Sequence, residues 1–277
     1  MVVESDLATS DERKGKKLRV ENDCALLHRQ ELALCYRLCE RFKFHEGVCN
    51  HLSWQIPGKD RFLLIAYGVH WSQATASDIL VLDFEGNVLE GNGQPERTGF
   101  VSHRAIHRAL GSEAAAVLHT HMPNSTALTC LRPECGGHLL PIHQNMLKFN
   151  GSIAYDDDWG GLFDEGESDR TTSVLTRFKK EHGRCPRVML SANHGVFAFG
   201  STIAEAWDNL YYLERMCEVQ VRALSCAGGD VSRLRLIRPD ALEDGASLAE
   251  SDRPLSIDAH WTAMKGMMRN EKPDYCS

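Results

Sequence analysis

The sequence predicts an α+β fold in which helices pack over a central, mainly antiparallel sheet. Short strand patterns separated by turns cluster between residues 48 and 89, which favours hairpins over repeated βαβ units. Longer amphipathic helix patterns lie before and after that cluster. The chain has 277 residues, of which 43% are hydrophobic and 25% charged, so it is long enough to bury one sizeable core.

The first half of the chain is expected to begin with a tail and to continue through a helix, hairpins and a second helix. Residues 1–22 are mostly polar and poor in large apolar side chains, which is typical of disorder. From Cys24 to Phe44 apolar residues recur at helical spacing, and Gly47 ends that helix. Beyond it the sequence predicts strands at 48–54, 61–65, 79–83 and 88–89, a helix at 100–110 and a buried strand at 115–121.

The second half is expected to carry further strands and then to end in helices. The predicted elements are a helix to about residue 131, a strand or edge segment at 139–142, a strand at 152–155, a helix at 167–181, two strands across 188–197 and a long helix at 202–226. Residues 230–254 are predicted irregular, and 255–269 a peripheral helix. The chain therefore divides into a tail (1–22), one domain (23–228) and a C-terminal extension with a peripheral helix (229–277).

Charge and hydropathy exclude two classes of partner. The net charge is −7 and no basic stripe interleaved with aromatic residues occurs, so we expect no nucleic acid partner. No stretch approaches the ~20 continuous apolar residues of a membrane span, so we expect no membrane contact. The ten cysteines lack a regular spacing, which fits reduced thiols in a cytoplasmic protein. Cys35 and Cys39 form a weaker alternative metal pair, because no partner pair follows them.

Three histidines predict a metal site. His119 and His121 end an apolar strand, and strand geometry turns both side chains to the same face, where they can grip one ion together. His194 lies at the turn between two later apolar strands. Three imidazoles with an open coordination position are the donor set of catalytic zinc sites.

The stretch from about Cys35 to Gln220 resembles the class II aldolase/adducin family, whose metal is held by His-x-His after a buried strand and by a later histidine in an Asn-His-Gly-like turn. The resemblance implies a three-layer α/β/α class II aldolase-like fold and a divalent metal. We expect Zn²⁺ there, with Mn²⁺ or Fe²⁺ as alternatives that imidazole also suits. It also implies a small-molecule substrate and a homotetramer or homodimer in which a neighbour closes each site.

The chain departs from the family where sugar-phosphate members carry a glutamate as fourth ligand or base, four residues before a helix histidine. The matching histidine is His103, and Gly99 stands at the position of the glutamate. Glu96 is the nearest substitute and is predicted to act as the base or as a metal-adjacent ligand, with an exposed loop acid as the other interpretation. His103, His107, His138 and His143 are expected to be structural, because none has ligand spacing to the main pair.

The phosphate-binding motifs of the family are also altered. Asn50-His51-Leu52-Ser53 stands for Gly-Asn-x-Ser, and Ile65-Ala66-Tyr67-Gly68 stands for Thr-Pro-Ser-Gly. The predicted substrate-binding residues are therefore His51, Ser53, Tyr67 and Gly68. A tyrosine in place of a small serine fills the space of a phosphate, so a phosphorylated sugar is disfavoured. The Asn-His and Tyr-Gly forms resemble the adducin-like branch.

These features predict a metal-dependent lyase that cleaves or forms a carbon–carbon bond through a metal-stabilised enediolate on a small, non-phosphorylated hydroxy-carbonyl substrate. Two alternatives stay open: a non-catalytic adducin-like interaction scaffold, and a three-histidine Fe(II) oxygenase on the same fold. The apolar side chains of the 255–269 helix are expected to pack across a subunit or over the mouth of the site.

Overall fold

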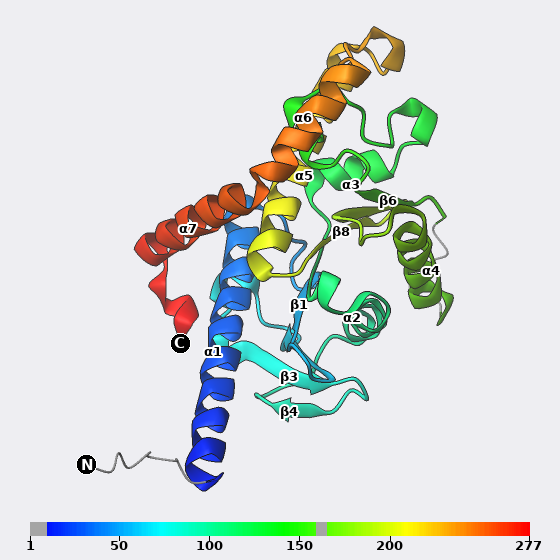
Figure 1. Ribbon diagram of the computed structural model, residues 1–277. Helices are drawn as coiled ribbons and strands as arrows, with labels where there is room; N and C mark the ends of the chain where they lie inside the picture. The colour runs from blue at the N-terminus through cyan, green and yellow to red at the C-terminus, as the bar shows by residue number, and fades with distance from the viewer. Residues whose placement is uncertain (1–9, 159–164) are drawn as a thin grey trace, which may run out of the picture.

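The computed structural model describes residues 10–158 and 165–277. Within them, eight strands form one sheet in the order β4-β3-β2-β1-β5-β8-β7-β6 (Figure 1). Strands β6 and β7 are parallel, and the other neighbouring strands are antiparallel. The α+β class with a mainly antiparallel sheet is thus confirmed. The strands are β1 (His51–Gln55), β2 (Arg61–Ile65), β3 (Ile79–Asp83), β4 (Val88–Glu90), β5 (Ala116–Thr120), β6 (Ile153–Asp156), β7 (Val188–Ser191) and β8 (Gly195–Gly200).

Helices cover both faces of the sheet, which confirms the three-layer arrangement. Helices α1 (Ser10–Phe42) and α5 (Ile203–Cys226) pack on one face, and α2 (Arg97–Leu110) and α4 (Glu165–His182) on the other (Figure 1). Strand β5 lies between these two layers of helices and is buried along its whole length. Its side chains alternate, so Leu118 joins the core under α1 and α5 while Val117 joins the core under α2 and α4.

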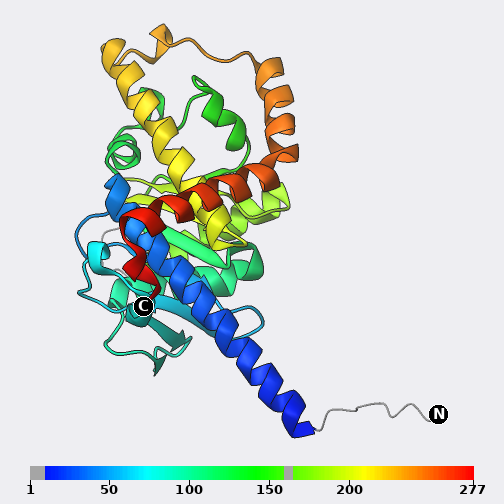
Figure 2. The same cartoon turned by 90° about the vertical axis from the view of Figure 1, so that its left-hand side faces the viewer.

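The first helix begins earlier than the pattern from Cys24 predicts. Helix α1 starts at Ser10 and runs as one element to Phe42 (Figure 2). The added stretch is rich in glutamate, lysine and arginine, which are good helix formers even without an apolar face. The predicted disorder of residues 1–9 lies outside the described residues, and the division into tail, domain and extension stays a prediction.

Two segments of the second half differ from the predicted secondary structure. Residues 139–142 form no strand, because side chains satisfy their backbone: Gln220 accepts from the Leu140 amide at 2.8 Å and Tyr155 from the Leu139 amide at 3.1 Å. Residues 239–251, predicted irregular, form helix α6 (Pro239–Ser251). Proline suits the first helical position, and Gly245 allows the helix to pack against Leu147.

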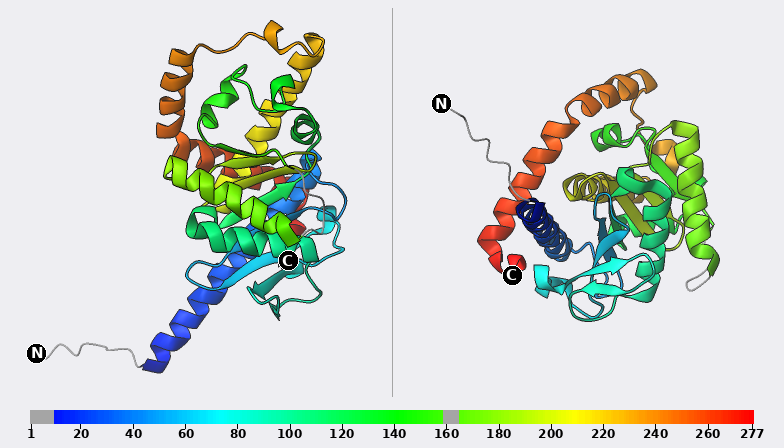
Figure 3. Two further views of the ribbon diagram at one scale, coloured as in Figure 1. Left: turned by 90° about the vertical axis from the view of Figure 1, so that its right-hand side faces the viewer. Right: turned by 60° about the horizontal axis from the view of Figure 1, so that its bottom comes forward.

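The peripheral helix predicted at 255–269 is present as α7 (Arg253–Glu271), and it lies alongside α1 (Figures 2 and 3). It buries Ile257, Trp261 and Met268, and the Trp261 indole donates to Glu31 of α1 at 3.2 Å. The apolar side of α7 therefore packs against its own chain and does not lie over the mouth of the site. Among the described helices, none is both long and apolar enough to cross a membrane.

Candidate metal centre

The three predicted ligands lie together at one end of the central strands. The Nε2 atoms of His119 and His121 are 3.1 Å apart, and His194 enters from the turn between β7 and β8. One ring nitrogen from each histidine lies within 4.8 Å of the others. In the described part of the chain, no other cluster of three or more histidines, cysteines or acids has this spacing. The cysteine pair at 35 and 39 is buried elsewhere in the core.

Outer hydrogen bonds set the direction of two ligands. The Nδ1 of His119 donates to the Val196 carbonyl at 3.0 Å, and the Nδ1 of His121 donates to a Glu46 carboxylate oxygen at 2.6 Å. Each of these rings therefore carries its proton on Nδ1 when neutral and directs an Nε2 lone pair at the other ring. Two lone pairs facing each other repel unless a cation lies between them, so these residues fit a metal ion.

Burial favours the neutral, metal-binding form of the ligands. Desolvation, together with the neighbouring imidazoles, lowers the pKa of His119 well below its usual range and that of His194 to about 4. Metal ions bind the deprotonated ring, so these pKa values mean that little proton competition occurs near neutral pH.

The backbone around His194 is specialised to bring the turn close to β5. Asn193 adopts a left-handed conformation with φ 54°, which asparagine tolerates, and its amide donates to the Thr129 carbonyl at 3.0 Å. A Cβ added at Gly195 would lie 2.6 Å from Cδ2 of His121 and 2.7 Å from the Thr120 carbonyl oxygen. Only glycine at this position lets the turn approach the metal ligands.

A cavity of about 240 Å³ opens beside the three histidines. His51 and Tyr67, which the sequence predicted to bind substrate, line this cavity, and Tyr67 is 60% exposed. Gly68 lines a smaller adjoining hollow instead. Ser53 is fully buried and is not among the residues that line the cavity. Its hydroxyl is bonded to two histidines of α2 and does not reach the cavity, and the substrate-binding role of Ser53 stays an untested prediction.

Glu96 lines the same cavity, but its carboxylate caps helix α2. Its Oε2 accepts from the Gly99 amide at 2.6 Å and from the Thr98 hydroxyl at 2.5 Å. Burial opposes ionisation, yet these hydrogen bonds outweigh it and lower the pKa of Glu96. Glu96 does not belong to the three-histidine group. Its role as a base stays a prediction.

Sequence reasoning missed Glu46, and it considered Asn50 only as part of an altered phosphate-binding motif. Glu46 orients His121, and Asn50 accepts from the backbone amides of Glu46 at 2.9 Å and of His121 at 3.3 Å. Both residues lie in the loop before β1, and the pairing of β1 with β5 brings that loop to His121. No spacing in the sequence therefore marks them as site residues.

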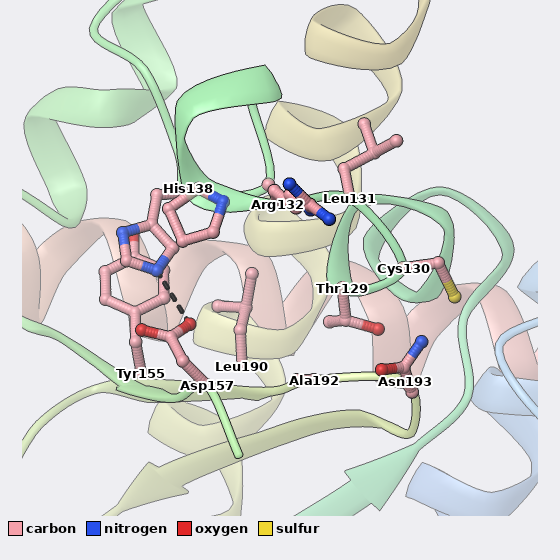
Figure 4. A pocket seen from close by; sticks show the side chains of 12 residues that line it. Thr129, Cys130, Leu131, Arg132, His138, Tyr155, Asp157, Leu190, Ala192 and Asn193 are labelled. Carbon is pink, nitrogen blue, oxygen red and sulfur yellow. Dashed lines mark hydrogen bonds and ion pairs between the residues drawn. The ribbon is translucent and has the colours of Figure 1, made fainter. Parts of the chain in front are cut away.

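A second cavity, of about 180 Å³, lies beside the turn that carries His194 (Figure 4). His138 stacks on Tyr155 there with 3.7 Å between ring centroids, and its Nε2 donates to Asp157 at 2.8 Å. These contacts agree with the structural role predicted for His138.

The sequence of this chain matches a known protein family. The family model for the Class II Aldolase and Adducin N-terminal domain matches residues 30–221. Rattus norvegicus alpha-adducin is 32% identical over 232 residues, which are 81% of this chain and 29% of that protein. The chain thus spans about a third of the length of its adducin relatives. A provisionally named aldolase class 2 protein of Caulobacter vibrioides is 32% identical over 218 residues, 78% of each chain.

Among solved structures, an aldolase II superfamily protein from Pseudomonas syringae superimposes with a TM-score of 0.80. The match has 26% identity and covers 91% of this chain and 96% of that one. Because the family model spans the sheet and all three histidines, and the relatives cover most of the chain, the protein belongs to the class II aldolase and adducin family.

Proposed function

We propose that the protein is a metal-dependent lyase that cleaves or forms a carbon–carbon bond in a small, non-phosphorylated hydroxy-carbonyl compound. The observation that carries the proposal is the 3.1 Å approach of the His119 and His121 Nε2 atoms, both left as lone-pair donors by their outer hydrogen bonds. A bound divalent cation, proposed to be Zn²⁺ with Mn²⁺ or Fe²⁺ as alternatives, would supply a Lewis acid for negative charge developing on a carbonyl oxygen.

The residues of the cavity favour a small uncharged or weakly charged substrate. Among the described residues that line it there is no lysine or arginine, and the ionised Glu96 adds negative charge. A phosphate dianion needs several cationic side chains or N–H donors, which the described residues lining the cavity do not supply. Tyr67 at the opening and Phe197 beneath the ligands supply apolar walls that exclude water from the reacting atoms.

The first experiment measures bound metal in the purified protein. His119→Ala with His121→Ala should abolish stoichiometric metal, whereas His138→Ala, a histidine outside the cluster, should leave it unchanged. A double variant that keeps wild-type metal content would refute the assignment. Carbonyl release from a panel of hydroxy-carbonyl compounds, measured with the zinc-loaded protein, then tests the lyase reaction. Oxygen consumption after anaerobic iron loading tests the Fe(II) oxygenase.

A scaffold function is the second candidate, and the 32% identity to alpha-adducin favours it. The intact ligand set argues against it, because a protein that only binds partners has no need of three converging imidazoles, two of them with tautomers fixed by outer hydrogen bonds. Metal binding without turnover of any carbonyl compound, together with capture of a protein partner, would favour the scaffold.

We also propose that the chain assembles as a homodimer or homotetramer in the cytoplasm. Its exposed large apolar side chains include Leu26 and Leu27 on α1 and Tyr67 at the opening of the cavity, and these are candidate contacts between subunits. Light scattering of the full chain measures the assembly, and a monomer at all concentrations would contradict it.

A further inference from the structure

Four buried side chains behind the metal centre form one continuous line of hydrogen bonds. The Nδ1 of His107 lies 3.1 Å from the Ala114 carbonyl, and its Nε2 lies 2.8 Å from the Ser53 hydroxyl. That hydroxyl lies 2.5 Å from Nδ1 of His103, whose Nε2 lies 2.8 Å from Nδ1 of His51. His51 is the member of the line that reaches the cavity.

The carbonyl at the far end sets the direction of every bond. A carbonyl only accepts, so His107 carries its proton on Nδ1 and offers a lone pair at Nε2. Ser53 must then donate its only hydrogen to His107, and it can only accept from His103. His103 in turn carries its proton on Nδ1 and accepts at Nε2. His51 therefore carries its proton on Nδ1 and keeps an Nε2 lone pair.

This assignment requires neutral rings, and burial favours them. His103 and His107 are 0% and 1% exposed. No acidic side chain in the described part of the chain bonds to either ring. Desolvation lowers the pKa of His107 to about 4, which agrees with a neutral ring near neutral pH.

The position of His51 beside the metal ligands is set by the sheet and by α2. His51 is the cross-strand partner of His119, and the two ring centroids are 4.9 Å apart. On its other side the ring packs on Gly99, where an added Cβ would lie 2.4 Å from its Cδ2 and 3.0 Å from its Nε2. The imidazole thus fills the space that any side chain at position 99 would need.

We infer that His51 is a substrate-binding residue whose Nε2 lone pair, oriented by His103, Ser53 and His107, accepts a hydrogen bond from a hydroxyl group of the substrate. This inference rests on the proposed function, from which the carbonyl group of the substrate is taken. Within the proposed hydroxy-carbonyl substrates it assigns His51 as the acceptor for a free hydroxyl, since a neutral acceptor gains nothing from an ether, a carboxylate or a phosphate oxygen.

The first test reads the proton position by NMR of the full chain labelled with ¹⁵N in its histidine rings, both metal-free and zinc-loaded. His51 should carry its proton on Nδ1 in both forms. His138, which donates through Nε2 to Asp157, serves as an internal reference with the opposite tautomer. A His51 proton on Nε2, or a mixture of the two tautomers, would overturn the inference.

A pair of serine variants tests the line itself. Ser53→Ala removes the central hydroxyl, so His51 should change to a mixture of tautomers while zinc stoichiometry stays at the wild-type value. Ser102→Ala removes a hydroxyl of the same cavity that bonds to the Thr98 carbonyl and not to a histidine, and it should leave His51 unchanged. A single Nδ1–H tautomer in Ser53→Ala would show that the line does not orient His51.

The hydroxyl requirement is tested with two probes, one that carries a free hydroxyl and one in which that hydroxyl is methylated. Hydroxyacetone should shift the Nε2 resonance of His51 in the zinc-loaded protein, and methoxyacetone, which lacks the donor, should not. Equal shifts with both compounds, or none with either, would overturn the hydroxyl contact. Absence of stoichiometric zinc would instead refute the proposed function, and the tautomer of the metal-free protein would still be readable.

Discussion

Replacing Glu46 by glutamine should weaken metal binding without removing a ligand. Glu46 accepts from Nδ1 of His121 at 2.6 Å, and its negative charge makes the opposite nitrogen a stronger donor to the metal. Glutamine keeps an acceptor oxygen at similar reach and loses the charge. Loss of such an outer partner typically costs 10- to 100-fold in affinity, which is about 1.4 to 2.7 kcal/mol. The Glu46 side chain is 67% exposed, so water screens its charge and we expect the lower end, about tenfold.

The assay is competition for zinc between the protein and a chromophoric chelator of known affinity. Glu90→Gln is the matched control, because Glu90 is also an exposed acid, at 58%, and pairs with Arg29 at 2.6 Å away from the cavity. Glu46→Gln should show a dissociation constant about tenfold higher than that of the control. Equal constants for the two variants would refute the conclusion that Glu46 tunes His121.

Four further predictions follow from single contacts. Gly195→Ala should displace His121 and abolish stoichiometric metal, measured by metal analysis, and a variant with full metal content would contradict the close approach described for the turn. Glu96→Gln should lower turnover by ~10²–10⁴ if Glu96 is the base, whereas unchanged turnover with a loss of about 1 kcal/mol in stability would leave it as a helix cap. Trp261→Ala should destabilise the protein by ~3–5 kcal/mol in urea unfolding, because its indole is buried between α7 and α1, and a loss under ~1 kcal/mol would contradict that packing. Burial lowers the pKa of His107 in the folded protein to about 4, below the ordinary value of 6.5. The unfolded chain therefore binds more protons between these pH values, and the free energy of unfolding should fall by roughly 3 kcal/mol from this group as the pH drops from 6.5 to 4. His107→Gln in the metal-free protein should make the free energy of unfolding less dependent on pH over this range.

Much of the fold could be predicted because its elements carry local patterns. The hairpin of β3 and β4 follows from apolar runs around a Glu-Gly-Asn turn, and the buried strand β5 from a continuous apolar run. Helix α6 was missed because it is short and polar and has no fully buried residue, with Leu242 only partly buried against the core, although Pro239 marks its start. The run at 139–142 has the composition of a strand, but Gln220, distant in the chain, satisfies its backbone instead.

By itself the sequence predicted the three candidate metal ligands, and the structure brings their ring nitrogens together. Strand alternation places His119 and His121 on one face, and the turn between two apolar strands presents His194. Which groups surround those ligands was decided by the tertiary structure, through the register that sets His51 opposite His119 and the packing of α2 that buries His103 against Ser53. Contacts of this kind join residues far apart in the chain, and since no local periodicity encodes strand register or helix packing, the proton order behind the site could be read only from the folded protein.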